Sequence, residues 1–246
     1  VLALFWIQIA VQTRLNPSLA PVGPSVGWID RLKSTYLLLP ILVAFIVVIG
    51  GIYLGVFTPT EAACFGCLIM MVIGVARRKL NLKGIIESLR ETMPIAAMIM
   101  FMLVSAWMFS AALTLSGLPT ALTNSIAGLG VSRYLVLALM MVVYLLLGCI
   151  MDIFAVLVIT LPIFFPIILA LGFDPLHFGV LCVLSVMAGS ISPPFGIIVY
   201  ALSGMNRDVP MFTIFRGVIP FFITLVISIF IIMFIPQIAT FLLSLR

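Results

Sequence analysis

Residues 187 to 196, MAGSISPPFG, interrupt one of the most apolar runs of the sequence. In a continuous helix, the amide of residue 193 would bond the carbonyl of Gly189, and the amide of residue 194 would bond that of Ser190. Proline stands at both donor positions, and proline has no N–H group. The sequence therefore predicts a broken helix that releases the carbonyl oxygens of Gly189 and Ser190.

The side chains around this break add further oxygen ligands. Ser190 and Ser192 carry hydroxyl groups, and the glycines at 189 and 196 permit unusual dihedral angles and close approach. Carbonyl and hydroxyl oxygens suit a small cation such as sodium, and the N-terminal end of the restarted helix favours an anion. A bend used only for packing is the alternative. The candidate ion- and substrate-binding residues here are Gly189, Ser190, Ser192, Pro193, Pro194 and Gly196, with Gly189, Ser190 and Ser192 as candidate Na+ ligands.

A second interruption separates the apolar runs 134 to 149 and 153 to 171. Each run is short for a span of about 20 residues, and no lysine or arginine lies at the join. The pair is either two tight spans that meet at the cytoplasmic face or a re-entrant hairpin whose tip stops inside the membrane. The tip favours the hairpin, because irregular backbone and the carboxylate of Asp152 are tolerated at depth only where they line a protein cavity. Asp152 can also cap the second arm, and the two roles are compatible.

A polar turn outside these interruptions has a local explanation. Thr58 suits the N-cap, Pro59 the first helical position and Glu61 the third, which together predict a capping box for a helix over residues 60 to 76. An ion-related or gating role for Glu61 is the alternative.

The composition places these residues in a membrane protein. Of 246 residues, 65% are hydrophobic and 8% are charged, and the mean hydropathy is +1.42. So few charges cannot cover a soluble globule, so we predict an all-α membrane protein with several spans. The basic residues behind the net charge of +5 lie between apolar runs, where they set topology and argue against nucleic acid as a partner. The four cysteines lie in apolar stretches and are expected to pack as apolar side chains.

The apolar runs cover residues 1 to 13, 36 to 57, 60 to 76, 94 to 115, 134 to 149, 153 to 171, 175 to 204 and 217 to 241. If the first run ends in the cytoplasm, ten of the 12 basic residues face the cytoplasm, and Arg133 and Arg246 lie outside. Basic, partly amphipathic stretches precede the prolines at 40, 94 and 220. We expect them to lie along the membrane surface and to turn inward at the proline, either as arms between moving and fixed parts or as plain interfacial loops.

Three separated motifs resemble the large membrane subunit of tripartite ATP-independent periplasmic (TRAP) transporters, the DctM-like permeases. They are GGIYLGVFTPTEAACFG at residues 50 to 66, LGCIMDIFAVLVITLPIFFPIILALGFDPLHFGV at 147 to 180, and GSISPPFGIIVY at 189 to 200. Consecutive interrupted helices that meet at the midplane are typical of secondary transporters. The motifs keep the family's order and spacing, and the resemblance covers essentially the whole chain.

The resemblance implies an elevator-type fold of the ion-transporter superfamily, in which each inverted repeat holds a re-entrant hairpin and a discontinuous helix. It implies import of organic acids, such as C4-dicarboxylates or sialic acid, across the bacterial inner membrane, with sodium as the coupling ion and no other cofactor. The implied partners are a small DctQ-like membrane subunit and a DctP-like periplasmic binding protein. On this basis Gly148 and Asp152 lie at a hairpin tip, and residues 189 to 196 lie at the broken helix.

Three parts are expected within that fold. Residues 1 to 93 hold membrane helices and cytoplasmic amphipathic arms, at the end of the first repeat and in the scaffold. Residues 94 to 207 form a transport unit with an outer interfacial helix, the hairpin over 134 to 171 and the broken helix over 175 to 204. Residues 208 to 246 add an arm and the last scaffold helix. Only one hairpin is found, so the chain is expected to be the C-terminal half or slightly more of a permease.

A channel and an intramembrane protease are the alternatives to a transporter. A channel also uses broken helices and re-entrant loops, although these usually repeat around a symmetric pore. An intramembrane serine protease would have to pair His177 with Ser190, but these residues are 13 positions apart, about 20 Å along a helix. His177 follows a helix cap at Asp174 and is expected at the outer membrane interface. We therefore do not expect an enzyme.

Overall fold

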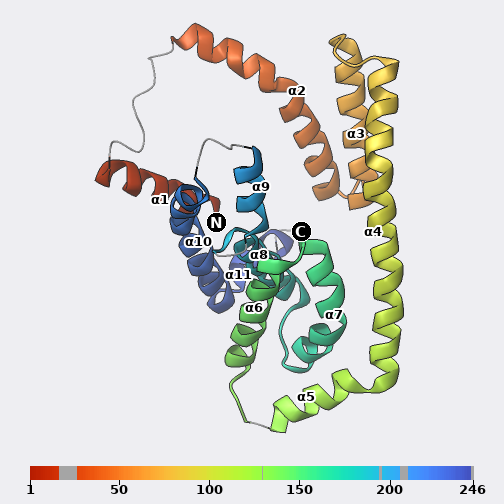
Figure 1. Ribbon diagram of the computed structural model, residues 1–246, viewed down its shortest axis with the longest axis vertical. Coiled ribbons are helices and arrows are strands. Elements are labelled where there is room, and N and C mark those ends of the chain that lie inside the picture. The colour runs from red at the N-terminus through yellow and green to blue at the C-terminus, as the bar shows by residue number, and fades with distance from the viewer. Residues whose placement is uncertain (17–26, 129, 194–195, 206–209, 245–246) are drawn as a thin grey trace. The chain divides into compact units, whose positions relative to one another are not determined.

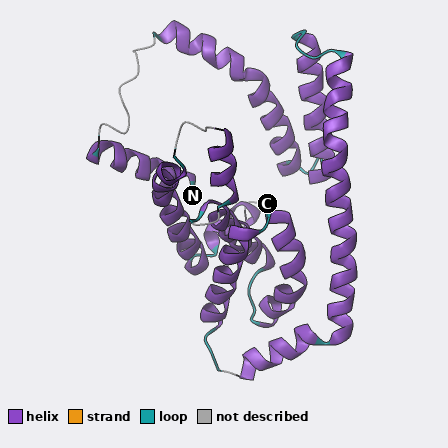
Figure 2. Ribbon diagram, viewed as in Figure 1, coloured by secondary structure: helices purple, strands orange, loops and turns teal. Residues whose placement is uncertain are grey.

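The structure is a computed structural model that describes residues 1–16, 27–128, 130–193, 196–205 and 210–244. Every regular element in these ranges is a helix (Figures 1 and 2). The helices are α1 (Leu2–Leu15), α2 (Trp28–Tyr53), α3 (Pro59–Ala76), α4 (Leu82–Ser116), α5 (Leu118–Gly128), α6 (Arg133–Ile150), α7 (Ile153–Ala170), α8 (Pro175–Ile191), α9 (Ile197–Met205), α10 (Met211–Phe234) and α11 (Gln237–Ser244).

Several of these helices are suited to lipid. Five described helices, α3, α4, α6, α7 and α10, are long and apolar enough to cross a membrane. Large apolar side chains such as Trp107 and Leu115 lie exposed on α4. Their exposure to water would be unfavourable, whereas contact with lipid acyl chains is not. The predicted class, an all-α membrane protein, is confirmed.

The prolines at 40, 94 and 220 lie inside continuous helices. α2 runs through Pro40, α4 through Pro94 and α10 through Pro220. That the basic stretch before each proline lies along the membrane surface and turns inward there stays a prediction. A proline removes one backbone hydrogen bond, and the neighbouring bonds of a long helix are enough to carry it past that point.

The chain divides into two compact units, Pro21–Met98 and Val1–Ala20 with Ile99–Arg246. In the smaller unit α2 packs on α3, and the turn between them forms the capping box. The Glu61 amide donates to the Thr58 hydroxyl at 3.4 Å, and the Thr58 amide donates to the Glu61 carboxylate at 2.8 Å. The division into parts 1 to 93, 94 to 207 and 208 to 246 stays a prediction.

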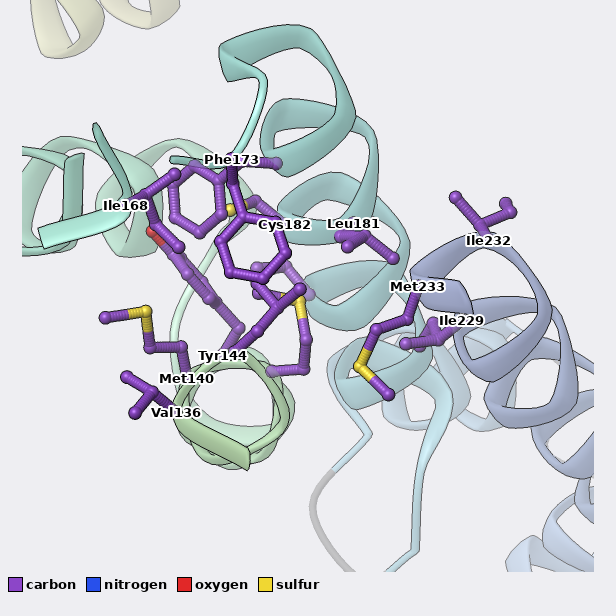
Figure 3. Close-up of a cluster of buried hydrophobic side chains, with 14 of the residues drawn as sticks. Val136, Met140, Tyr144, Ile168, Phe173, Leu181, Cys182, Ile229, Ile232 and Met233 are labelled. Carbon is purple, nitrogen blue, oxygen red and sulfur yellow. The ribbon is translucent and has the colours of Figure 1, made fainter. Parts of the chain in front are cut away.

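The larger unit has its core between α6, α7, α8 and α10 (Figure 3). Tyr144 of α6 lies at the centre of this core, completely buried, with its ring edge-on to Phe164 of α7 and to Phe178 of α8. Ile229 and Met233 extend the core onto α10. Helix α8 is therefore covered by α6 on one side and by α10 on another.

Helices α6 and α8 approach each other through glycine. A Cβ atom on Gly148 would stand 2.6 Å from the carbonyl oxygen of Val186. A Cβ atom on Gly189 would collide with the carbonyl oxygen of Leu145 and with the backbone of Gly148. The two helices thus meet backbone to backbone. This contact holds the last turn of α6, just before the hairpin tip, against the last turn of α8, just before the break.

His177 is buried inside the protein, which its sequence position does not predict, and its place at the outer membrane interface stays a prediction. Its side chain is 1% exposed, and its Nε2 atom lies 2.8 Å from the carbonyl oxygen of Ile232 in α10. That carbonyl lies in the last turn of α10, where helical donors run out and a side-chain partner is needed. The cap expected at Asp174 is present, because its carboxylate accepts from the Leu176 and His177 amides.

Helix α1 packs on α10 although the two are far apart in the sequence. The Thr224 hydroxyl lies 2.6 Å from the Gln8 side-chain oxygen, and the rings of Phe5 and Phe221 lie 5.5 Å apart. Helix α1 thus belongs to the larger unit.

We expect Gly148→Ala and Gly189→Ala each to lower the stability of the protein by about 1–3 kcal/mol, because the added methyl group must displace backbone. Gly179→Ala is the matched control, since it lies in the same helix as Gly189 and its Cβ would meet nothing within 4 Å. Thermal unfolding in detergent measures the stability of the three variants and of the parent protein. Equal stability of all three would contradict the backbone contact.

For the capping box, we expect Thr58→Ala to lower the free energy of unfolding by about 1 kcal/mol, because the N-cap side chain is lost. Glu61→Gln should leave it nearly unchanged, because glutamine can also complete the box. Neither variant should change how thermal stability responds to added sodium. A Glu61→Gln variant with normal thermal stability and altered sodium dependence would support the ion-related role instead.

Candidate ion and substrate site

Helices α6 and α7 form a hairpin whose tip consists of Met151 and Asp152. Each helix has 18 residues and is therefore about 27 Å long. The Asp152 carboxylate accepts a hydrogen bond from the Phe154 amide at 3.0 Å, so it caps α7. Asp152 is exposed, and its described hydrogen bonds stay within the start of its own helix.

The predicted interruption is present, because α8 ends directly before Ser192 and α9 begins directly after Gly196. The prediction that the Gly189 carbonyl is left without a donor is wrong. The Ser192 amide donates to it at 2.9 Å. The last turn tightens to a bond between residues three apart, which supplies the donor that Pro193 lacks. Pro194 lies outside the described residues.

Gly196 restarts the helix and gathers carbonyl oxygens around itself. Its amide donates to the Ser192 carbonyl at 2.9 Å, and its own carbonyl accepts from the Val199 and Tyr200 amides. The carbonyl oxygens of Ser190 and Ser192 both lie 3.0 Å from the point where a Cβ on Gly196 would stand. Only a residue without a side chain fits against both oxygens.

The two serine hydroxyls of the break have different partners. Ser190 is 5% exposed and Ser192 is 3% exposed. The Ser190 hydroxyl donates to the Met187 carbonyl of its own helix at 2.8 Å. The Ser192 hydroxyl lies 2.8 Å from the sulfur of Cys149 in α6. Ser192 therefore joins the break to the end of the first hairpin helix.

The structure brings Gly148, Gly189 and Ser192 together where α6 meets α8, and it adds Cys149 to them. The sequence predicts only apolar packing for the cysteines, so the contact of Cys149 with Ser192 is not predicted. The available signal was its position beside Gly148, a few residues before an interruption. Of the other candidates, Asp152 caps α7 at the hairpin tip, and Thr58, Pro59 and Glu61 lie in the smaller unit.

A cavity of about 570 Å³ adjoins the break. Its lining includes Pro193 and Tyr200 from the broken helix and Phe215 and Arg216 from α10. Cavities of this size are typical of small-molecule sites. From the sequence, Arg216 is only one of the basic residues that set topology. Its place on this wall makes it a candidate ligand for an organic anion.

The ligand atoms gathered at the break are neutral. The described ranges contain no group of three or more His, Cys, Asp or Glu side chains that could hold a metal ion. Carbonyl and hydroxyl oxygens without carboxylates suit a monovalent cation better than calcium or a transition metal, which rely on charged or softer ligands. The N-terminus of α9 adds a partial positive charge that favours a nearby anion.

Comparison with known proteins gives a consistent family. The sequence model described as "Tripartite ATP-independent periplasmic transporter, DctM component" matches residues 2–238. The sialic acid TRAP transporter large permease protein SiaM of Vibrio cholerae is 32% identical over 78% of this chain and 45% of its own length. The C4-dicarboxylate TRAP transporter large permease protein DctM of Pseudomonas aeruginosa is 30% identical over 89% of this chain and 51% of its own length.

A third relative, the ectoine TRAP transporter large permease protein TeaC of Halomonas elongata, is 30% identical over 90% of this chain and 52% of its own length. The chain spans about half the length of these curated relatives. These matches agree with the interrupted helices and with the spacing of the three motifs. The chain belongs to the DctM component family of tripartite ATP-independent periplasmic transporters.

Proposed function

We propose that this chain works within the large permease subunit of a sodium-coupled TRAP transporter that imports an organic acid across the bacterial inner membrane. The observation that carries the proposal is the contact between α6 of the hairpin and the break after α8, through Gly148, Gly189 and Ser192. In a member of this family, such a meeting of interrupted helices supports an ion and substrate site at the midplane.

Sodium would bind among the neutral oxygens of the break. The carbonyl oxygens of Ser190 and Ser192 lie close together beside Gly196, and the buried Ser192 hydroxyl is nearby in the chain. The Gly189 carbonyl accepts one hydrogen bond and has a second lone pair for a cation. Burial strengthens such contacts, because little water competes for the ion.

The substrate anion would bind near the positive end of α9. The cavity lined by Pro193, Tyr200 and Arg216 is wide enough for a small organic acid and has one permanent positive charge on its wall. A bound cation at the break would further favour the anion, because opposite charges attract strongly where water is excluded. This mutual attraction would couple the two ligands.

The hairpin would be re-entrant and would move together with α8 in an elevator-type transition. The glycine contact ties α6 to α8 without intervening side chains, which supports movement of the two as one body. The Asp152 carboxylate would then lie at membrane depth beside the site, where a cap can also serve as a polar ligand.

The substrate would carry a carboxylate or sulfonate group. The names of relatives specify sialic acid, C4-dicarboxylate, ectoine and isethionate, and each of these compounds has such an anionic group. A small membrane subunit and a periplasmic binding protein would be the partners, and a relative is named as a DctMQ permease protein. A channel is the second candidate, and it would pass ohmic current without organic acid.

The proline pair tests the sodium site in the full-length permease that carries this sequence. Replacing Pro193 and Pro194 together by alanine supplies two N–H donors, which should close the break and weaken sodium dependence about tenfold or more, since each new backbone bond is worth about 1 kcal/mol. Sodium-driven uptake of organic acid into proteoliposomes measures the effect. Unchanged sodium dependence would contradict the proposal, and Pro162→Ala in the middle of α7 serves as the control.

Asp152→Asn separates capping from ion binding. Asparagine caps helices as well as aspartate does, so thermal stability should stay within about 0.5 kcal/mol of the parent protein. Sodium affinity should fall severalfold, because the variant lacks the negative charge beside the cation. Unchanged sodium affinity would limit Asp152 to its structural role.

A further inference from the structure

We infer that Cys149 is a positioning residue that holds the Ser192 hydroxyl with its oxygen lone pairs available to sodium. The inference rests on the proposed sodium site at the break. It starts from two contacts of one thiol: the Cys149 sulfur lies 3.2 Å from the Leu145 carbonyl oxygen and 2.8 Å from the Ser192 hydroxyl oxygen.

The hydrogen atoms of this group can be assigned by counting donors. A carbonyl oxygen can only accept, so the contact with Leu145 uses the single hydrogen of the Cys149 thiol. The contact between Cys149 and Ser192 must then use the hydroxyl hydrogen, with sulfur as the acceptor. The Ser192 oxygen donates in this arrangement and accepts nothing from the described residues, so its lone pairs stay available.

Burial makes this orientation persistent. Cys149 is 8% exposed and Ser192 is 3% exposed, so bulk water does not compete for the hydroxyl hydrogen. The glycine contact at Gly148 and Gly189 fixes the distance between the two backbones that carry these side chains. The thiol is therefore held at one place relative to the break.

A freely rotating hydroxyl would be a poorer cation ligand, because its hydrogen can point toward the ion. The Ser190 hydroxyl is oriented within its own helix, because its hydrogen is donated to the Met187 carbonyl. Ser192 is described with no such backbone acceptor, and its printed side-chain partner is Cys149. Both serine oxygens are thus prepared to accept, one through backbone and one through a neighbouring helix.

The experiment measures sodium affinity of the full-length permease in complex with its small membrane subunit, under reducing conditions. Affinity is read from the thermal stabilisation produced by increasing sodium, with choline chloride holding ionic strength constant. We expect Cys149→Ala to bind sodium about fivefold more weakly, which corresponds to the loss of one neutral hydrogen bond. Cys149→Ser restores a group that donates and accepts, so it should stay within about twofold of the parent.

Two further variants separate orientation from packing. Cys182→Ala removes another buried thiol of the same unit, 1% exposed and part of its core, and should leave sodium affinity unchanged. Cys149→Val fills the space of the thiol without a polar atom, so it should bind sodium as weakly as Cys149→Ala does. It replaces the alanine variant in the comparison if that variant does not fold. Melting temperatures without sodium report folding for each variant.

The outcomes distinguish this inference from the proposed site. Ser192→Ala with unchanged sodium affinity would overturn the proposed sodium site and the inference with it. Weakened binding in Ser192→Ala, with normal affinity in both Cys149→Ala and Cys149→Val, would overturn the inference alone. Equal weakening in Cys149→Ala and Cys149→Ser would also overturn it, because the serine variant retains both hydrogen-bonding roles.

Discussion

The contact between Gly148 of α6 and Gly189 of α8 determines how the hairpin meets the broken helix. A Cβ atom on either glycine would collide with backbone of the other helix, so this approach is closed to every larger residue. It aligns the last turn of α6 with the last turn of α8 and brings Cys149 within hydrogen-bonding distance of Ser192. The rest of the candidate site is arranged around this one approach.

The break itself follows from the need to satisfy backbone polar groups away from water. Pro193 lacks the N–H group that the Gly189 carbonyl would need in a regular helix, and the Ser192 amide takes that place. Gly196 then resumes the helix, and its small size lets two carbonyl oxygens crowd together. The result is a short stretch of chain rich in neutral oxygen, with a helix N-terminus beside it.

The amino-acid sequence predicts the local features well, because each depends on a few neighbouring residues. Hydropathy predicts most of the long helices, the proline pair predicts the break, and the caps at Thr58, Asp152 and Asp174 follow from their own side chains. Contacts between distant segments are not encoded in this local way. The burial of His177 against α10, the thiol contact of Cys149 and the place of Arg216 on the cavity wall all depend on how helices pack.

The pairing of α1 with α10 has a consequence for biosynthesis. Gln8 reaches Thr224 across 216 positions of sequence, so α1 leaves the ribosome long before its partner exists. During that interval the Gln8 amide has to face lipid, the insertion machinery or another temporary neighbour. Helix α1 is therefore made well before α10 and can find its place only afterwards, so this part of the unit cannot assemble until α10 has been made.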